Sequence, residues 1–223
     1  MNTTFYFDLI GVFFFSLSGT LTARRYKKLD LFGLAFVGLI TAIGGGTVRD
    51  VIIDAHPIAW VSHSGYFIAI VLGYAAALAF GRVILRFAKP ILTLDALAVS
   101  FAAIAGLQKS LEYGASELSA LVFAVITATV GGVIRDVICN EVPMVLRKEI
   151  YASAVMAGGV VYLVVAWMVP YDLQWAQWSG FITIAAIRLL AIRFRWDLDT
   201  RAVQRRIRML RYTWKKLNRG KHV

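Results

Sequence analysis

The 223-residue sequence is poor in the residue types that build disulfides, metal sites and soluble surfaces. Its one cysteine, Cys139, excludes an intrachain disulfide and is expected to be a small, inert core residue. The three histidines, His56, His63 and His222, lack the spacing of metal ligands, so we expect no fixed metal site and no cofactor. Charged residues make up 17% of the chain, below the roughly 25% of soluble domains. An ordinary soluble domain is therefore excluded.

Apolar residues are abundant instead, at 59% of the chain, and the mean hydropathy is +0.70. A bilayer core about 30 Å thick is crossed by about 20 apolar residues of helix. Hydropathy predicts an all-α integral membrane protein with seven transmembrane helices, at residues 5–22, 31–53, 66–85, 92–107, 118–138, 150–169 and 178–192. The fourth of these spans is short, and its boundaries are the least sharply defined. No basic region precedes the first apolar run, which favours a retained span over a cleaved signal peptide.

Lysine and arginine alternate between the connections in a way that predicts the orientation. The first, third and fifth connections carry basic residues at 24, 25, 27 and 28, at 82, 86 and 89, and at 147 and 148. The second and sixth connections have none, and the fourth has only Lys109. Because basic residues near span ends are retained in the cytoplasm, we expect the N-terminus outside and the C-terminus inside.

The basic excess of the chain is concentrated at its end. Residues 193–223 hold eleven of the 24 lysines and arginines and two aspartates, or +9 of the formal +11. A basic segment directly after a span is attracted to anionic lipid, by about 1 kcal/mol per basic residue. We therefore expect lipid contact and no nucleic-acid partner. The predicted seventh helix occupies residues 173–196, and a basic cytoplasmic tail occupies residues 197–223.

An internal repeat relates the two halves of the membrane region. The stretch TAIGGGTVRDVIIDAHP, residues 41–57, aligns without gaps to TATVGGVIRDVICNEVP, residues 127–143, with nine of seventeen positions identical. The preceding spans also match, with Asp8 opposite Asp95 and Gly19 opposite Gly106. The repeats are assigned to residues 1–90 and 91–172. Each has three spans, so the second enters the membrane from the opposite side, and transported species are expected to pass between such inverted repeats.

Adjacent glycines stand at mirrored depths in the second and fifth spans: Gly44, Gly45 and Gly46 in one, and Gly131 and Gly132 in the other. Adjacent glycines lower the cost of a break in a helix, and a break would turn free carbonyls and helix ends toward a shared centre. Glycines also let two membrane helices pack closely. The mirrored placement beside charged residues favours breaks at the pore.

An Arg-Asp pair follows each glycine group, Arg49 with Asp50 and Arg135 with Asp136. An unpaired charge inside the bilayer costs at least a few kcal/mol, so these side chains are expected to face protein or water. They either line an ion path or lock the repeats together by salt bridges across the axis, and the residues leave both alternatives open. Candidate partners for Arg49 are Asp136, Asp8 and Asp95.

Three further expectations concern single polar residues. Asp8 and Asp95 begin matching spans, where a carboxylate favours a helix N-terminus, so capping is expected. Arg188, within the seventh span, is expected to extend toward the cytoplasm. Small hydroxyl residues in the spans are candidate polar pore-lining groups: Thr41, Thr47, Thr127, Thr129, Ser16 and Ser18.

The motifs GGGTVRD and GGVIRD, the opening DLIGVFFFSLSGTLTARR and LDLFG at residues 29–33 resemble the prokaryotic branch of the trimeric intracellular cation channels. The duplicated domain of that branch is also described as glycine-transporter type. The resemblance implies a homotrimer in a prokaryotic plasma membrane, with one pore per protomer between the first, second, fourth and fifth spans. It implies passage of monovalent cations, chiefly potassium. The glycines at 44–46, 131 and 132 would be kinks, the second milder because Val130 replaces a glycine.

Two functions fit these residues. A channel needs a continuous polar path whose selectivity arises from oxygens and charges at its narrowest point. A secondary transporter of glycine or another small amino acid would use the same inverted-repeat site. An enzyme is disfavoured because the spans contain no nucleophile–base arrangement and no metal-ligand spacing. The ion selectivity, the gating stimulus and the trimer contacts are not specified by the sequence.

Overall fold

The structure is a computed structural model, and it describes residues 3–26, 29–87, 89–147 and 150–194. Within these residues it is entirely helical, with nine helices and no strands. Six helices are long and apolar enough to cross a membrane: α1 Thr3–Tyr26, α2 Leu31–Ile52, α4 Gly65–Ile84, α5 Pro90–Glu112, α6 Glu117–Ile138 and α9 Leu173–Phe194. The apolar helix α8, Ala152–Met168, is shorter, at 17 residues. The predicted tail at 197–223 lies outside the described residues.

Helix α5 is the central helix of the fold and is longer than its sequence prediction. It is 23 residues long, whereas hydropathy predicted a short span at residues 92–107. The apolar stretch of α5 that could cross the membrane is 78% buried inside the protein, a larger share than in any other described span. A run of alanines and a glycine between Ala96 and Gly106 lets α1, α6 and α9 approach it closely. The hydropathy segment underestimated α5 because polar residues at both of its ends are buried in protein rather than exposed at a membrane surface.

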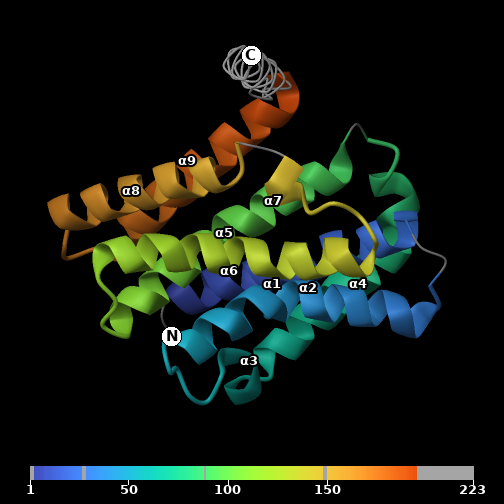
Figure 1. Cartoon of the computed structure of the whole chain (residues 1–223), viewed down its shortest axis with the longest axis horizontal. Helices are drawn as coiled ribbons and strands as arrows, with labels where there is room; N and C mark the ends of the chain where they lie inside the picture. Colours follow the sequence, from blue (N-terminus) through green and yellow to red (C-terminus); the bar gives the residue numbers. More distant parts are fainter. Residues whose placement is uncertain (1–2, 27–28, 88, 148–149, 195–223) are drawn as a thin grey trace, which may run out of the picture.

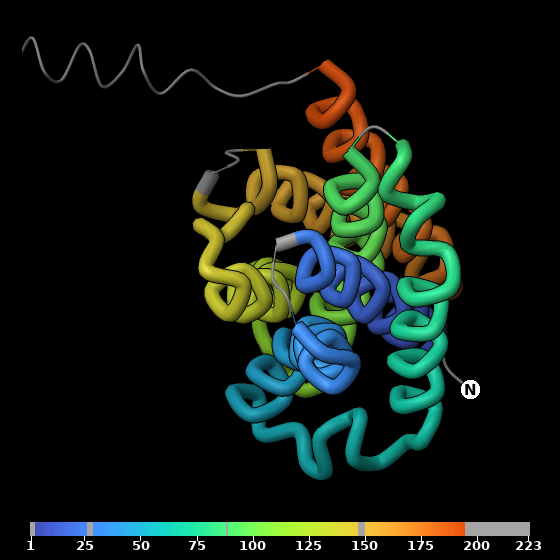
Figure 2. The backbone as a smooth tube through the Cα atoms, turned by 90° about the vertical axis from the view of Figure 1, so that its right-hand side faces the viewer, coloured from blue at the N-terminus to red at the C-terminus, as the bar shows by residue number. Residues whose placement is uncertain are grey.

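Helices of the two repeats pack against each other in matched pairs. Helix α1 packs against α5, and α2 packs against α6. Each pair joins an element of the first repeat to its counterpart in the second. Helices α8 and α9 pack together on one flank, and α9 also contacts α5 (Figures 1 and 2).

The repeat extends into the turns after α2 and α6. Asp54 and Asn140 occupy matching positions there, with φ of 55° and 56°. Asp and Asn tolerate this left-handed conformation better than other non-glycine residues. Each turn leads into a four-residue helix, α3 Ala59–Ser62 or α7 Met144–Arg147, which the hydropathy pattern does not predict.

Candidate functional site

Both glycine-containing helices run unbroken through their glycines, so the expected interruption of the backbone is absent. The structure shows that the glycines have a packing role where α2 crosses α6. A Cβ added at Gly45 would lie well under 3.0 Å from the carbonyl oxygen of Thr127, and one added at Gly131 would meet that of Thr41 as closely. Real Cβ atoms essentially never come that close. The two helices therefore touch backbone to backbone, reciprocally across the repeat axis.

The other glycines of the two groups have more room. A Cβ at Gly46 would be 3.7 Å from Arg49 Nη2, and one at Gly132 would be 3.7 Å from Arg135 Nη2, which are ordinary contacts. A Cβ added at Gly44 would lie 3.4 Å from the Gly131 Cα and 3.2 Å from Ile134 Cδ1, a tighter contact but one with the far end of a flexible side chain. Close packing is thus required mainly at one glycine per helix.

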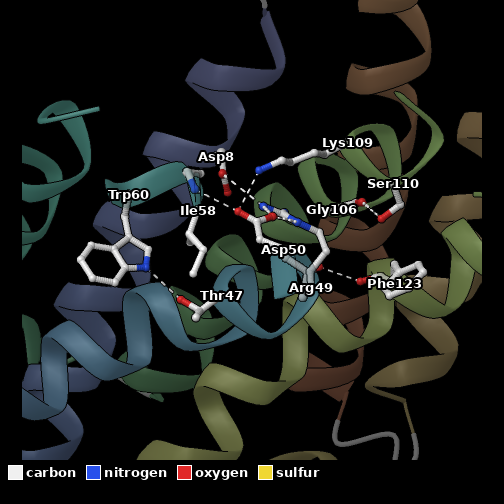
Figure 3. Close-up of polar contacts among 12 residues, drawn as sticks. Asp8, Thr47, Arg49, Asp50, Ile58, Trp60, Gly106, Lys109, Ser110 and Phe123 are labelled. Carbon is white, nitrogen blue, oxygen red and sulfur yellow. Dashed lines mark hydrogen bonds and ion pairs between the residues drawn. The ribbon is translucent and has the colours of Figure 1, made fainter. Parts of the chain in front are cut away.

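A buried charged group, here called the first cluster, forms around Arg49 and Asp50 (Figure 3). Arg49 Nε donates to Asp50 Oδ1 at 2.8 Å, and Lys109 Nζ, from α5, donates to Asp50 Oδ2 at 2.8 Å. Asp50 Oδ2 also accepts from the Ala59 main-chain N–H at 3.0 Å, which fixes the start of α3. Asp8, on α1, lies 3.9 Å from Arg49 Nη2. This group joins α1, α2, α3 and α5.

The second cluster repeats this design around Arg135 and Asp136. Arg135 Nε donates to Asp136 Oδ1 at 2.9 Å, and Asp136 Oδ2 accepts from the Met144 N–H at 2.9 Å, at the start of α7. Arg135 Nη1 donates to Asp95 Oδ1 at 3.1 Å. Asp95 Oδ2 also accepts from Arg188 Nη2, on α9, at 2.8 Å. The matched bonds show that the Arg-Asp pairs anchor the short helices within each repeat.

A tyrosine completes each cluster. Tyr66 donates its hydroxyl to Asp8 Oδ2 at 2.7 Å, and Tyr151 donates to Asp95 Oδ2 at 3.0 Å. Both tyrosines are buried. Neither tyrosine was singled out from the sequence. The two tyrosines are 85 residues apart, whereas the gap-free alignment of the motifs pairs residues that are 86 apart, so it does not place the tyrosines opposite each other.

Two cavities meet at the first cluster. The small cavity, about 20 Å³, has room for about one water and is lined by Gly46, Arg49, Asp50 and Thr127 among others. The entrance cavity, about 330 Å³, lies between the start of α1, the α2–α4 connection and the end of α5. Asp8, Ala59 and Tyr66 line both cavities. The two cavities therefore lie next to each other, one at the end of the bundle where α1 begins and the other reaching the crossing of α2 and α6.

The comparisons with known proteins agree with this architecture. A family model described as "Glycine transporter" matches residues 5–82 and 92–167. The chain is 39% identical over 197 residues to a UPF0126 membrane protein of Vibrio cholerae, covering 88% of this chain and 82% of that protein. It is 34% identical over 200 residues to the UPF0126 inner membrane protein YadS of Escherichia coli K12, covering 89% and 96%.

Solved structures with the same fold are named as ion channels, which is more specific than the names of the two UPF0126 relatives. The crystal structure of a TRIC trimeric intracellular cation channel orthologue from Rhodobacter sphaeroides superposes with a TM-score of 0.80 at 30% identity, covering 87% of this chain and 99% of that one. A prokaryotic TRIC channel solved in 0.5 M KCl gives a TM-score of 0.78 at 30% identity, covering 87% and 98%. The chain belongs to the TRIC family. It is a multi-pass membrane protein of the bacterial type.

Two predictions about charged residues in this TRIC protein are wrong, and of the three candidate partners of Arg49 only Asp8 is confirmed among the described residues. Asp8 and Asp95 lie inside their helices and act as partners of tyrosine and arginine rather than as caps. Arg188 is 4% exposed and reaches inward to Asp95, because a buried carboxylate stabilises its guanidinium. Among the described residues, Arg49 has Asp50 and Asp8 as its ion-pair partners, and not Asp136.

Within the part of the chain that the structure describes, the ion pair that joins the two repeats is Lys109 with Asp50, at 2.8 Å. From the sequence, Lys109 counted only as a basic residue in the fourth connection. The Nζ atom also lies 5.9 Å from the centre of the Tyr113 ring. Its position near the end of α5 brings it into the entrance cavity, where it lies between solvent and the first cluster.

The hydroxyl groups predicted to line the pore donate hydrogen bonds to main-chain carbonyls. Ser16 Oγ donates to the Ile70 carbonyl at 2.8 Å, and so joins α1 to α4. Each of the others donates to a carbonyl three or four residues earlier in its own helix: Ser18, Thr41, Thr47, Thr127 and Thr129. Thr47 also accepts from Trp60 Nε1 at 3.0 Å (Figure 3). Thr127 lines the small cavity.

Proposed function

We propose that this TRIC protein is a homotrimeric channel for monovalent cations, chiefly potassium, with one pathway in each protomer. The pathway begins in the entrance cavity, passes Asp8 and Arg49, and reaches the crossing of α2 and α6 at Gly46 and Thr127. The observation that carries this proposal is that Asp8 and Tyr66 line both the entrance cavity and the small cavity at the crossing. The related solved structures are named as trimeric cation channels, which supports the same function here.

The charges around the pathway favour cations. The two cavities are lined by the carboxylates of Asp8, Asp50 and Glu112 and by the fixed cations of Arg49 and Lys109. A surplus of one carboxylate attracts cations and repels anions, and in a narrow space with low-dielectric walls that effect is strengthened. The small cavity matches an ion that has lost most of its hydration shell, and not an amino acid.

We further propose that the protein crosses the membrane seven times, with α8 as the sixth span. The N-terminus and the entrance cavity then face the outside, because the basic residues at the ends of spans lie at the opposite surface. In this arrangement the first cluster lies on the outer side of the α2–α6 crossing and the second cluster on the inner side. The described conformation has space on the outer side down to that crossing.

Recording from purified protein in planar bilayers tests the proposed function. Under a potassium chloride gradient we expect unitary current steps that reverse near the potassium equilibrium potential, because the carboxylate surplus excludes chloride. Replacing potassium by N-methyl-D-glucamine on both sides should abolish the steps. Absence of steps, together with saturable and electrically silent uptake of labelled glycine into proteoliposomes, would replace the channel with a carrier.

A further inference from the structure

The two clusters are not equivalent at their tyrosine-bound aspartates. In the second cluster Asp95 is fully buried and receives three donors, from Tyr151 at 3.0 Å, Arg135 at 3.1 Å and Arg188 at 2.8 Å. The Arg188 guanidinium also lies 3.7 Å above the centre of the Tyr151 ring. The carboxylate and the aromatic face together hold one cation, which α9 supplies from outside the two repeats.

The first cluster has the same carboxylate and the same tyrosine but lacks that cation. In the part of the chain that the structure describes, Asp8 accepts from Tyr66 at 2.7 Å, has Arg49 at 3.9 Å, and meets no counterpart of Arg188. Its side chain is 13% exposed, whereas that of Asp95 is 0% exposed. The second basic residue of this cluster, Lys109, is bonded to Asp50. The place beside Asp8 opens into the entrance cavity.

We propose that Asp8 and Tyr66 bind a mobile monovalent cation in the place that the Arg188 guanidinium occupies at Asp95 and Tyr151. The protein then contains one site twice: the second copy holds a cation tethered to α9, and the first copy exchanges its cation with solution. The Asp8 carboxylate supplies the charge, and the Tyr66 hydroxyl oxygen and ring face supply the remaining contacts.

The pairing within the two clusters supports this assignment. In the second cluster Arg188 pairs with Asp95 itself, at 2.8 Å. In the first cluster Lys109 pairs with Asp50, and Asp8 keeps only the longer contact to Arg49, at 3.9 Å. Glu112 adds a further carboxylate to the entrance cavity. A cation at Asp8 would give this carboxylate the close partner that Arg188 gives to Asp95.

This site rests on the proposed function for its role, since a cation bound at Asp8 lies where the entrance cavity meets the small cavity. It is the position at which a cation entering from the entrance cavity would leave bulk water. Its existence can be tested by binding alone. A ligand that binds the folded state stabilises it in proportion to the logarithm of its concentration, so thermal unfolding reports on occupancy.

The test is the melting temperature of the purified full-length protein in detergent, with potassium chloride exchanged for N-methyl-D-glucamine chloride at constant ionic strength. For the wild type we expect a rise of about 5 °C or more at a hundredfold excess over Kd. Asp8→Asn should remove the rise, and Tyr66→Phe should weaken the affinity several-fold. Asp54→Asn should respond as the wild type does: it removes an exposed carboxylate, and asparagine already stands at the matching position 140.

A second arm uses millimolar guanidinium as a free replacement for the Arg188 side chain. Guanidinium should not stabilise Asp8→Asn, but it should stabilise the double variant Asp8→Asn, Arg188→Ala, in which the site at Asp95 is vacated. An unchanged potassium response in Asp8→Asn would overturn the proposal, as would a folded double variant that ignores guanidinium. If the double variant does not fold, the potassium arm alone decides.

The outcomes also separate the site from the channel. Potassium-dependent stabilisation that is lost in Asp8→Asn, in a protein that passes no current, would retain the site and overturn the proposed function. Unitary currents in a protein with no potassium-dependent stabilisation would retain the channel and overturn the site.

Discussion

Gly45→Ala is expected to destabilise the protein by about 3 kcal/mol or more, because its new methyl group would overlap the Thr127 carbonyl. The obstacle is backbone, which cannot rotate away as a side chain can. Relief therefore requires α2 and α6 to separate along their whole crossing. Gly131→Ala should have a similar effect, because its methyl group would overlap the Thr41 carbonyl. The measurement is thermal unfolding of the purified protein, together with the yield of assembled protein.

The neighbouring glycines provide matched controls for this prediction. Gly46→Ala and Gly132→Ala place a methyl group 3.7 Å from an arginine nitrogen, which is an ordinary contact. Alanine is also favoured over glycine in a helix by about 1 kcal/mol. These variants should therefore unfold within about 1 kcal/mol of the wild type. Equal losses at Gly45 and Gly46 would contradict the packing role and favour a role in bending the helix.

Asp95→Asn is expected to destabilise the protein by about 3–5 kcal/mol, because it leaves two buried guanidinium groups without their shared counter-charge. Arg135 is fully buried and Arg188 is 4% exposed, so water cannot replace the lost carboxylate. Asparagine has nearly the shape of aspartate and leaves the packing unchanged. The loss of stability would therefore result from the missing charge and not from altered packing. It is measured as the change in the free energy of unfolding.

The matched variant at the other repeat is Asp8→Asn. Its nearest cation, Arg49, is 3.9 Å away and keeps its bond to Asp50, and the side chain is 13% exposed. We therefore expect a cost of about 1–2 kcal/mol, the size of a weakened hydrogen bond to Tyr66. If Asp8→Asn and Asp95→Asn lowered the free energy of unfolding equally, this would contradict the proposal that only Asp95 has a close arginine partner from α9.

The sequence was sufficient to predict an all-α membrane fold and buried partners for the two Arg-Asp pairs. Apolar runs predicted helices, and the repeat of GG-x-x-RD indicated two related sites. The alignment placed Asp8 opposite Asp95 and Arg49 opposite Arg135, and the structure places each aspartate near the arginine of its own repeat. These predictions succeeded because burying a charge in a membrane helix requires a partner, which constrains residue type strongly.

The features that the sequence did not predict have a common physical cause. Glycine in a membrane helix permits a bend, a close crossing or both, and the close crossing at Gly45 becomes visible only from its distance to the neighbouring carbonyl. Arg188 and Lys109 stand near helix ends, where a long side chain reaches either water or protein, and the choice depends on where Asp95 and Asp50 lie in three dimensions. An alignment allowing one gap would have matched Tyr66 to Tyr151.

The most direct test of the proposed pathway is silver accessibility at Thr127, which lines the small cavity. Silver is a monovalent cation similar in size to potassium and binds thiolates, so it reaches a cysteine wherever potassium can pass. In a Cys139→Ala background, Thr127→Cys channels recorded in planar bilayers should lose their current irreversibly when micromolar silver is added on the side of the N-terminus. Thr129→Cys, two residues along the same helix, should keep its current. Full current through silver-treated Thr127→Cys channels would contradict a pathway at the crossing of α2 and α6.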